Sequence, residues 1–235
     1  MRPKAILFDM DGTLLPMDQN VFMKHYFGEM AKVLAPLGLA PEAVAPTIWE
    51  GTKAMMKNTG ETTNDEVFWQ VFTQISGLDA APFRPVADAF YSNQFHRARA
   101  ATAENPLAVE AVRVAREKAE KVVLATTPLF PMVGQKSRMG WVGLKPEDFD
   151  LVTSYETDRY CKPNPAYFRD VCRRIGVEPE QCVMIGNDET EDMAAATAAG
   201  IPACFLVTDC RIAGEAGWDG PQGTFAEMVE WLRAL

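Results

Sequence analysis

The chain has 235 residues, of which 48% are hydrophobic and 23% are charged. That length suits one large domain or a medium domain with an insert, and the composition excludes disorder, collagen and coiled coil as the main state. The formal net charge is −9 at pH 7. Such a surface repels polyanions, so we expect neither nucleic acid nor a membrane as a partner.

The sequence also gives expectations about location. The apolar run before Asp9 is shorter than the roughly 7–15 residues of a signal peptide, and none reaches the roughly 18 of a membrane span. The cysteines have no CxxC spacing, so we expect reduced thiols in a cytoplasmic protein. They are Cys161, Cys172, Cys182, Cys204 and Cys210.

Short, nearly continuous apolar runs predict strands that are buried on both faces. These runs are Ala5–Phe8, Val122–Ala125, Phe149–Thr153, Cys182–Ile185 and Ala203–Val207. Helical patterns separate them: from Asn105 as N-cap through Ala115, about Pro165 to Arg174, Thr190 to Ala199, and roughly Thr224 to Ala234. This alternation predicts an α/β fold, a Rossmann-like doubly wound parallel sheet with helices on both faces. Residues 208–223 are predicted to form a surface loop.

Residues 17–103 break the alternation, because their apolar residues recur at helical spacing and no strand pattern is present. We therefore predict a helical domain over 17–103, inserted into an α/β core domain made of residues 1–16 and 104–235. The insert is rich in aromatic residues. They either fill its own core or line a pocket closed over the sheet.

Two aspartates follow the first predicted strand, in the run Asp9-Met10-Asp11-Gly12-Thr13. Residues two apart in a strand point the same way, so both carboxylates emerge at the carboxyl edge where open α/β sheets bind ligands. Adjacent carboxylates are costly unless a cation lies between them or one is protonated. A cation site would favour Mg²⁺, and a carboxylate beside a general acid can attack phosphorus. The alternative is a solvated turn, where Gly12 permits the bend and Thr13 bonds the loop.

Three further polar groups follow later strands. Thr126 closes the second apolar run, and Lys162 stands just before a predicted helix, where Pro163 and Pro165 fix the course of the chain. The run Gly186-Asn187-Asp188-Glu189-Thr190-Glu191-Asp192 follows the fourth. Acidic residues suit a helix N-terminus, which accounts for Glu189 and Glu191 as solvent-facing residues.

These four motifs, in this order, resemble those of the haloacid dehalogenase superfamily, in which DxDGT follows the first strand. The resemblance covers the whole predicted sheet and implies a magnesium-dependent hydrolase with a helical cap between the first and second motifs. It implies that Asp9 is the nucleophile and Asp11 the general acid and base, while Thr126 and Lys162 neutralise the phosphoryl oxygens. Gly12 and Thr127 would also contact substrate, although many relatives carry Asn at the position of Thr127.

The resemblance also implies a metal site made of Asp9, Asp11, Asp188 and Asp192. The family has Gly-Asp followed by a second aspartate four or five residues on, and this chain has Asn187 directly after the glycine. A four-residue spacing selects Asp188, while a five-residue spacing selects Asn187. We assign the direct ligand to Asp188, because an anionic oxygen binds Mg²⁺ more strongly than an amide. Asp192 would then hold an inner-shell water or Lys162.

The resulting hypothesis is hydrolysis of a small phosphorylated metabolite through an aspartyl-phosphate, by a monomer or homodimer. A phosphosugar mutase would use the same residues. A dehalogenase is disfavoured, because that branch lacks the second aspartate and a leaving halide needs no proton. A non-catalytic binding protein would have no reason to retain this charge cluster.

Overall fold

The computed structural model describes residues 2–235, and these form an α/β protein built on one parallel sheet. The strand order is β3-β2-β1-β4-β5-β6. The strands are β1 (Ala5–Phe8), β2 (Lys121–Leu124), β3 (Leu151–Val152), β4 (Cys182–Gly186), β5 (Ala203–Val207) and β6 (Gln222–Gly223). All four side chains of β1 are fully buried, which suits its central place between β2 and β4.

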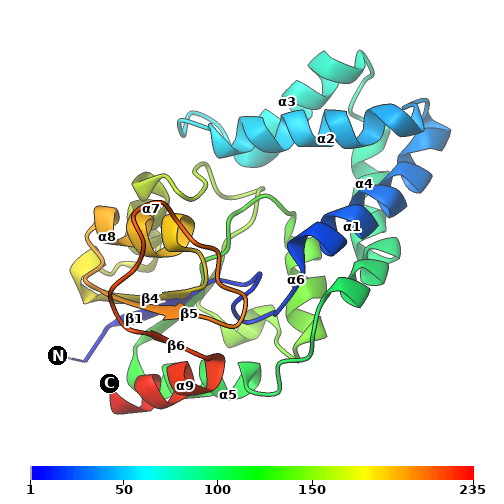
Figure 1. Ribbon diagram of the computed structural model, residues 1–235. Coiled ribbons are helices and arrows are strands. Elements are labelled where there is room, and N and C mark those ends of the chain that lie inside the picture. The colour runs from blue at the N-terminus through cyan, green and yellow to red at the C-terminus, as the bar shows by residue number, and fades with distance from the viewer. Residues whose placement is uncertain (1) are drawn as a thin grey trace.

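Helices cover both faces of the sheet, as the doubly wound fold requires (Figure 1). α5 (Ala108–Lys118) and α9 (Phe225–Ala234) pack on one face, and α7 (Pro165–Ile175) and α8 (Ala195–Ala199) on the other. α6 (Met132–Trp141) follows β2. Short helical turns complete this part of the chain: η3 (Pro146–Asp148), η4 (Pro179–Gln181) and η5 (Glu189–Ala194).

The segment between β1 and β2 is helical and lies to one side of the sheet (Figure 1). It comprises α1 (Gln19–Leu34), η1 (Ala35–Leu37), α2 (Pro41–Met56), α3 (Asn64–Ser76), α4 (Phe83–Ser92) and η2 (Gln94–Ala101). The two connections between the sheet and this helical segment run antiparallel and are joined by backbone hydrogen bonds. Asp18 N donates to Ala101 O at 3.0 Å, and Ala103 N donates to Pro16 O at 2.9 Å.

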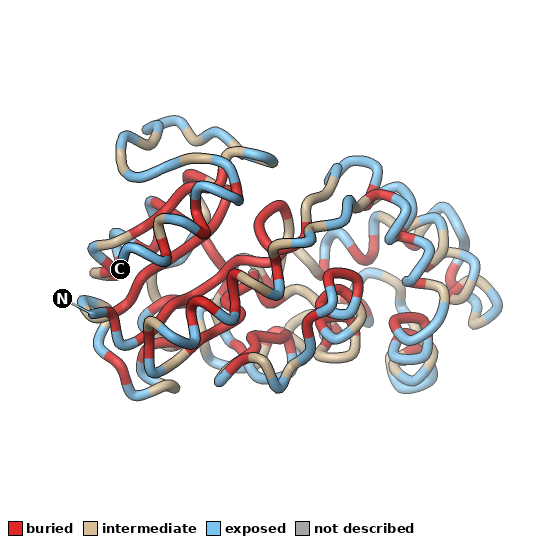
Figure 2. Tube along the Cα trace, turned by 90° about the horizontal axis from the view of Figure 1, so that it is seen from below, coloured by how far each residue is buried: buried red, intermediate tan, exposed pale blue. Residues whose placement is uncertain are grey.

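One buried cluster continues from the sheet into the helical segment. Aromatic rings connect the two parts of the cluster. The ring centroids of Phe95 in η2 and Trp141 in α6 are 5.2 Å apart, and those of Phe130 and Tyr26 in α1 are 5.7 Å apart. Figure 2 shows the strands buried along their length, while the outlying helices bury only one side. The aromatic residues of the segment therefore mainly fill a core. Some of them, including Tyr26, Trp69 and Tyr91, also line a small pocket together with Tyr155.

Several predicted elements differ from the structure at their ends. Residues 208–223 are not entirely loop, because Gln222–Gly223 forms the edge strand β6 beside β5. A polar two-residue strand leaves no apolar run to detect. α5 begins three residues after Asn105, whose side chain accepts from Leu107 N at 3.2 Å and donates to Leu14 O at 3.0 Å. No helix of the described residues combines the length and apolar character needed to cross a membrane.

Candidate active site

Asp9 and Asp11 emerge at the carboxyl end of β1, where the backbone turns sharply. Asp9 N donates to Ile185 O at 2.9 Å, which fixes this residue to the neighbouring strand β4. Gly12 has a φ of +88°, and a Cβ there would lie 2.3 Å from the Asn187 side chain. The turn therefore requires glycine, both for its backbone angle and for the close approach.

Lys162 lies between Asp9 and Asp192, the first and last aspartates predicted for the site. Its Nζ donates to Asp9 Oδ1 at 2.8 Å and to Asp192 Oδ1 at 2.6 Å, and its side chain is only 1% exposed. Burial opposes the charged form, but the charges of Asp192 and Asp9 outweigh it and raise the pKa of Lys162 well above its usual value. A protonated amine is therefore held against the proposed nucleophile.

The approach to Lys162 is fixed by the helix that follows. Asn164 caps α7 by accepting from Ala166 N at 3.0 Å, and Pro165 occupies the first turn of the helix. The aromatic rings of Tyr167 and Phe168 each lie 5.9 Å from the ammonium. The sequence around the lysine thus sets both its direction and its dry surroundings.

Asp192 is buried and fully engaged with the protein. Oδ1 accepts from Lys162, and Oδ2 accepts from the backbone N of Asn187 at 3.0 Å and of Asp188 at 3.1 Å. Burial raises the pKa of Asp192 to about 7, although the ammonium of Lys162 acts in the opposite direction. This geometry suits a residue that holds the lysine, and it leaves little room for Asp192 as a direct metal ligand.

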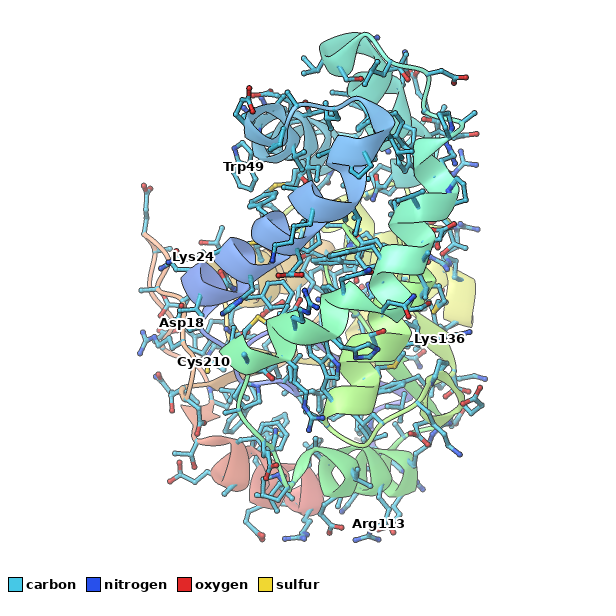
Figure 3. The ribbon with its side chains drawn as sticks, turned by 90° about the vertical axis from the view of Figure 1, so that its right-hand side faces the viewer. Asp18, Lys24, Trp49, Arg113, Lys136 and Cys210 are labelled. Carbon is cyan, nitrogen blue, oxygen red and sulfur yellow. The ribbon has the colours of Figure 1, made fainter. Side chains whose placement is uncertain are left out.

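Asn187 and Asp188 have different environments. Asn187 is buried, accepts from Thr13 Oγ1 at 2.9 Å and donates to Cys210 O at 2.7 Å, so it ties two loops together. Asp188 is half-buried, and its Oδ1 accepts from Thr190 N at 2.7 Å and Glu191 N at 2.8 Å as the cap of η5. Cys210 and Asp18, which lie close together in Figure 3, line an open groove that reaches Gly12 and Asn187.

The prediction that Glu189 and Glu191 face solvent was wrong. Glu189 is 3% exposed, forms an ion pair with Arg211 and accepts from Gly214 N at 2.8 Å. Glu191 is half-buried and accepts from Thr127 Oγ1 at 2.9 Å. Each carboxylate contacts a residue of another loop in place of water. The acidic pattern at the start of the helix does not predict these contacts.

Thr126 lies at the end of β2 and is almost fully buried. Its carbonyl accepts from Thr153 Oγ1 at 2.6 Å and from the Tyr167 hydroxyl at 2.9 Å. These bonds hold the strand end at the edge of the site. Neither Tyr167 nor Thr153 was among the predicted site residues. A buried aromatic on a helix carries no distinctive pattern, whereas Thr153 closes a predicted strand and could have been found by the signal that selected Thr126.

Two side chains that sequence reasoning missed reach the site from outside the four motifs. Arg138 of α6 is fully buried and forms an ion pair with Asp11. Asn64, at the start of α3, is also fully buried; it donates to Pro128 O at 3.2 Å and to Cys161 Sγ at 3.3 Å. Asn64 thereby binds the helical segment to the loops that follow Thr127 and precede Lys162.

The predicted metal site consists of four aspartates, and the structure does not bring their side chains together as one cluster. Within residues 2–235, no group of three or more His, Cys, Asp or Glu side chains gathers tightly enough to hold a metal ion. The donor set at the end of β1 is nevertheless of the hard-oxygen type that Mg²⁺ prefers. The residues present therefore fit a site completed by backbone carbonyl and water oxygens.

A buried lysine thus bonds two aspartates at the carboxyl edge of a parallel sheet, which is the edge where α/β enzymes bind their ligands. The family model of haloacid dehalogenase-like hydrolases matches residues 3–200. The chain belongs to this family, and the predicted resemblance and Rossmann-like α/β fold are both confirmed.

Known proteins similar to this chain include enzymes of two chemistries. Phosphoglycolate phosphatase from Xylella fastidiosa is 28% identical over 218 residues, which cover 89% of this chain and 82% of that protein. A HAD phosphatase from Thermococcus onnurineus has a TM-score of 0.62 at 20% identity, with 97% of each chain covered. A 2-haloacid dehalogenase from Pseudomonas syringae has a TM-score of 0.63 at 19% identity, with 99% of each covered. Because phosphatases and dehalogenases share this fold, the fold does not identify the reaction, and the residues of the site must be used to infer it.

Proposed function

We propose that this hydrolase cleaves phosphomonoesters of small metabolites through an aspartyl-phosphate on Asp9. The observation that carries the proposal is the buried ammonium of Lys162, bonded to both Asp9 and Asp192. A fixed cation beside the attacking carboxylate stabilises the negative charge of an incoming phosphoryl group. The similarity to phosphoglycolate phosphatase supports a phosphorylated acid or sugar fragment as the substrate.

In the proposed reaction, Asp9 attacks phosphorus and Asp11 gives its proton to the leaving alkoxide. Asp11 then removes a proton from the water that hydrolyses the intermediate. Burial raises the pKa of Asp11, against the lowering effect of Arg138, and a raised pKa suits a carboxyl group that must carry a proton. Asp11 also favours phosphate over halide chemistry, because an alkoxide leaves only with a proton.

The phosphoryl oxygens would be bound by the Thr126 hydroxyl and by Lys162. Gly12 would contact the substrate by keeping the turn open to it, because its own amide donates to Leu15 O at 2.8 Å. Thr127 is proposed to act through Glu191, to which its hydroxyl is bonded. The helical segment would serve as a cap that excludes water until the intermediate forms. Its bonds to the loops around Thr126 and Lys162 through Asn64 support that role.

We propose Mg²⁺ as the cofactor, held by the Asp9 carboxylate, the Asp11 carbonyl and Asp188. When bound, it supplies positive charge to the phosphoryl oxygens. Asp192 is assigned to Lys162 and not to the metal, because its carboxylate already accepts three hydrogen bonds. The buried sulfurs of Cys172 and Cys182 lie 3.6 Å apart, where one thiol can donate to the other. We propose a cytoplasmic location from the scattered cysteine pattern of the sequence.

Removal of the metal is expected to lower turnover of p-nitrophenyl phosphate by about a hundredfold or more, because the Lys162 ammonium alone would then stabilise the phosphoryl charge. The measurement is phosphate release after treatment with a chelator, followed by addition of Mg²⁺. Recovery with Mg²⁺ is expected for the natural sequence, and Asp188→Asn should need a higher Mg²⁺ concentration for half-maximal rate. Undiminished activity in the chelator would exclude this metal site.

The proposed function is tested by incubating the enzyme with a panel of small phosphorylated acids, sugars and alcohols and measuring inorganic phosphate. Release of phosphate from several of them, with one preferred by kcat/KM, supports a phosphatase. Conversion of a sugar phosphate to its isomer without stoichiometric phosphate release would identify a mutase instead. Chloride release from 2-chloropropionate without phosphatase activity would identify a dehalogenase.

A further inference from the structure

Arg138 is a buried cation at the proposed general acid, and it lies outside all four motifs. It belongs to α6 and its side chain is 0% exposed. Nη1 donates to Asp11 Oδ2, and Nη2 donates to Gln135 Oε1. The guanidinium lies over the ring of Phe130, with its carbon 4.2 Å from the ring centroid. Three separate contacts therefore fix both the position and the plane of the guanidinium.

The burial of this charge is costly unless a carboxylate compensates it. Among residues 2–235, the ion pair of Arg138 is with Asp11, so each group is the other's counterion. The Nε atom of Arg138 and the Oδ1 atom of Asp11 are buried without hydrogen-bond partners. A pair built only for stability is expected to satisfy these atoms, whereas one built around a reacting carboxyl leaves an oxygen unpaired.

The support for Arg138 continues into the strand end that carries Thr126. Gln135 Nε2 donates to Thr153 O at 3.1 Å, and Thr153 Oγ1 donates to Thr126 O at 2.6 Å. The arginine is therefore anchored to the second strand of the site, independently of the turn that carries Asp11. Such an anchor can hold the Asp11 side chain in one orientation while the turn itself binds a ligand.

We propose that Arg138 is the positioning residue of Asp11. By holding Oδ2, it directs Oδ1 to the oxygen that leaves phosphorus. This assignment rests on the proposed function. As Asp9 forms its bond to phosphorus, the ester P–O bond breaks and the proton on Oδ1 passes to the leaving oxygen. In the second half of the reaction, water bonds to phosphorus, the bond to Asp9 breaks, and the water proton returns to Oδ1.

The experiment compares two substrates that depend differently on that proton. p-Nitrophenolate leaves without protonation, whereas an alkoxide such as that of glycerol phosphate does not. Because kcat/KM reports the first phosphoryl transfer, Arg138→Met is expected to lower kcat/KM for glycerol phosphate about tenfold to a hundredfold more than for p-nitrophenyl phosphate. A burst of p-nitrophenol, followed by slow turnover, is expected because hydrolysis of the intermediate also needs Asp11.

Two further variants protect this result against a folding defect. Arg138→Lys keeps the charge and is expected to restore part of the substrate ratio, although one ammonium cannot span Asp11 and Gln135 in the same plane. Gln135→Met removes the anchor alone, and we expect a smaller shift of the ratio in the same direction. Ser137→Ala is the matched control on α6, because its hydroxyl bonds Tyr91 O and not the site; it should leave the ratio unchanged.

Equal losses of kcat/KM for both substrates, with a reduced burst amplitude, would show that Arg138 only supports folding and would overturn the inference. A ratio like that of the natural sequence would overturn it as well. Failure of the proposed function has a different signature: the natural sequence would then turn over p-nitrophenyl phosphate without a phosphorylated Asp9, whatever the behaviour of the Arg138 variants.

Discussion

Asp9→Asn is expected to lower kcat for p-nitrophenyl phosphate by about 10⁴ or more, because a neutral amide cannot attack phosphorus to form an acyl phosphate. The fold should persist, since the bond from residue 9 N to Ile185 O uses only the backbone. The measurement is steady-state release of p-nitrophenol, with thermal unfolding recorded for the same preparation.

Asp150→Asn is a matched control for this change. Asp150 pairs with Arg116 at 2.7 Å through a side chain that is 20% exposed, and it precedes β3 at the opposite, amino edge of the sheet. We expect its activity to remain within about threefold of the natural sequence, as for other changes remote from a site. More than a tenth of the natural rate in Asp9→Asn would reject Asp9 as the nucleophile.

Lys162→Met is expected to reduce kcat about 10²- to 10³-fold, because one fixed positive charge at the developing phosphoryl charge is lost. It should also destabilise the protein by about 3–5 kcal/mol near pH 8, since Asp9 and Asp192 would remain buried without their cation. The measurements are the rate of phosphate release and the free energy of unfolding in urea.

The stability loss in Lys162→Met has a defined pH dependence. Without the ammonium, the folded-state pKa of Asp192 rises further above its unfolded value, so protonation favours the folded state. The deficit relative to the natural sequence should therefore shrink as the pH falls from 8 to 5. Lys136→Met, at an exposed position of α6 that Figure 3 labels, is the control and should change neither property. A pH-independent deficit would contradict the assigned role of Lys162.

Much of the site could be predicted because strand ends are visible in the sequence. β1, with Asp9 and Asp11 directly after it, has the predicted bounds, and so does β5. Parallel strands place their carboxyl ends at one edge, which groups Asp9 and Asp11 with the residues that follow β4. Lys162 and Asp192 were assigned to the same site by the resemblance to the family's motifs.

The remaining features depend on tertiary contacts that no local pattern records. Arg138 lies on a helix, where an arginine is usually exposed, and only the packing of α6 turns it towards Asp11. Glu189 stands at a helix start that predicts solvent exposure, yet the loop carrying Arg211 covers it. Asn187 stands directly after the glycine of its motif, and only the structure shows that its amide joins Thr13 to the backbone of Cys210.

The central claim is that Asp9 carries the phosphoryl group between the two halves of the reaction. The most direct test is to quench the enzyme during turnover of p-nitrophenyl phosphate, reduce it with borohydride and sequence its peptides by mass spectrometry. Borohydride converts an aspartyl-phosphate to homoserine. We predict homoserine at position 9, and only when substrate is present. Unmodified Asp9 during rapid turnover, or homoserine at another aspartate, would contradict the account.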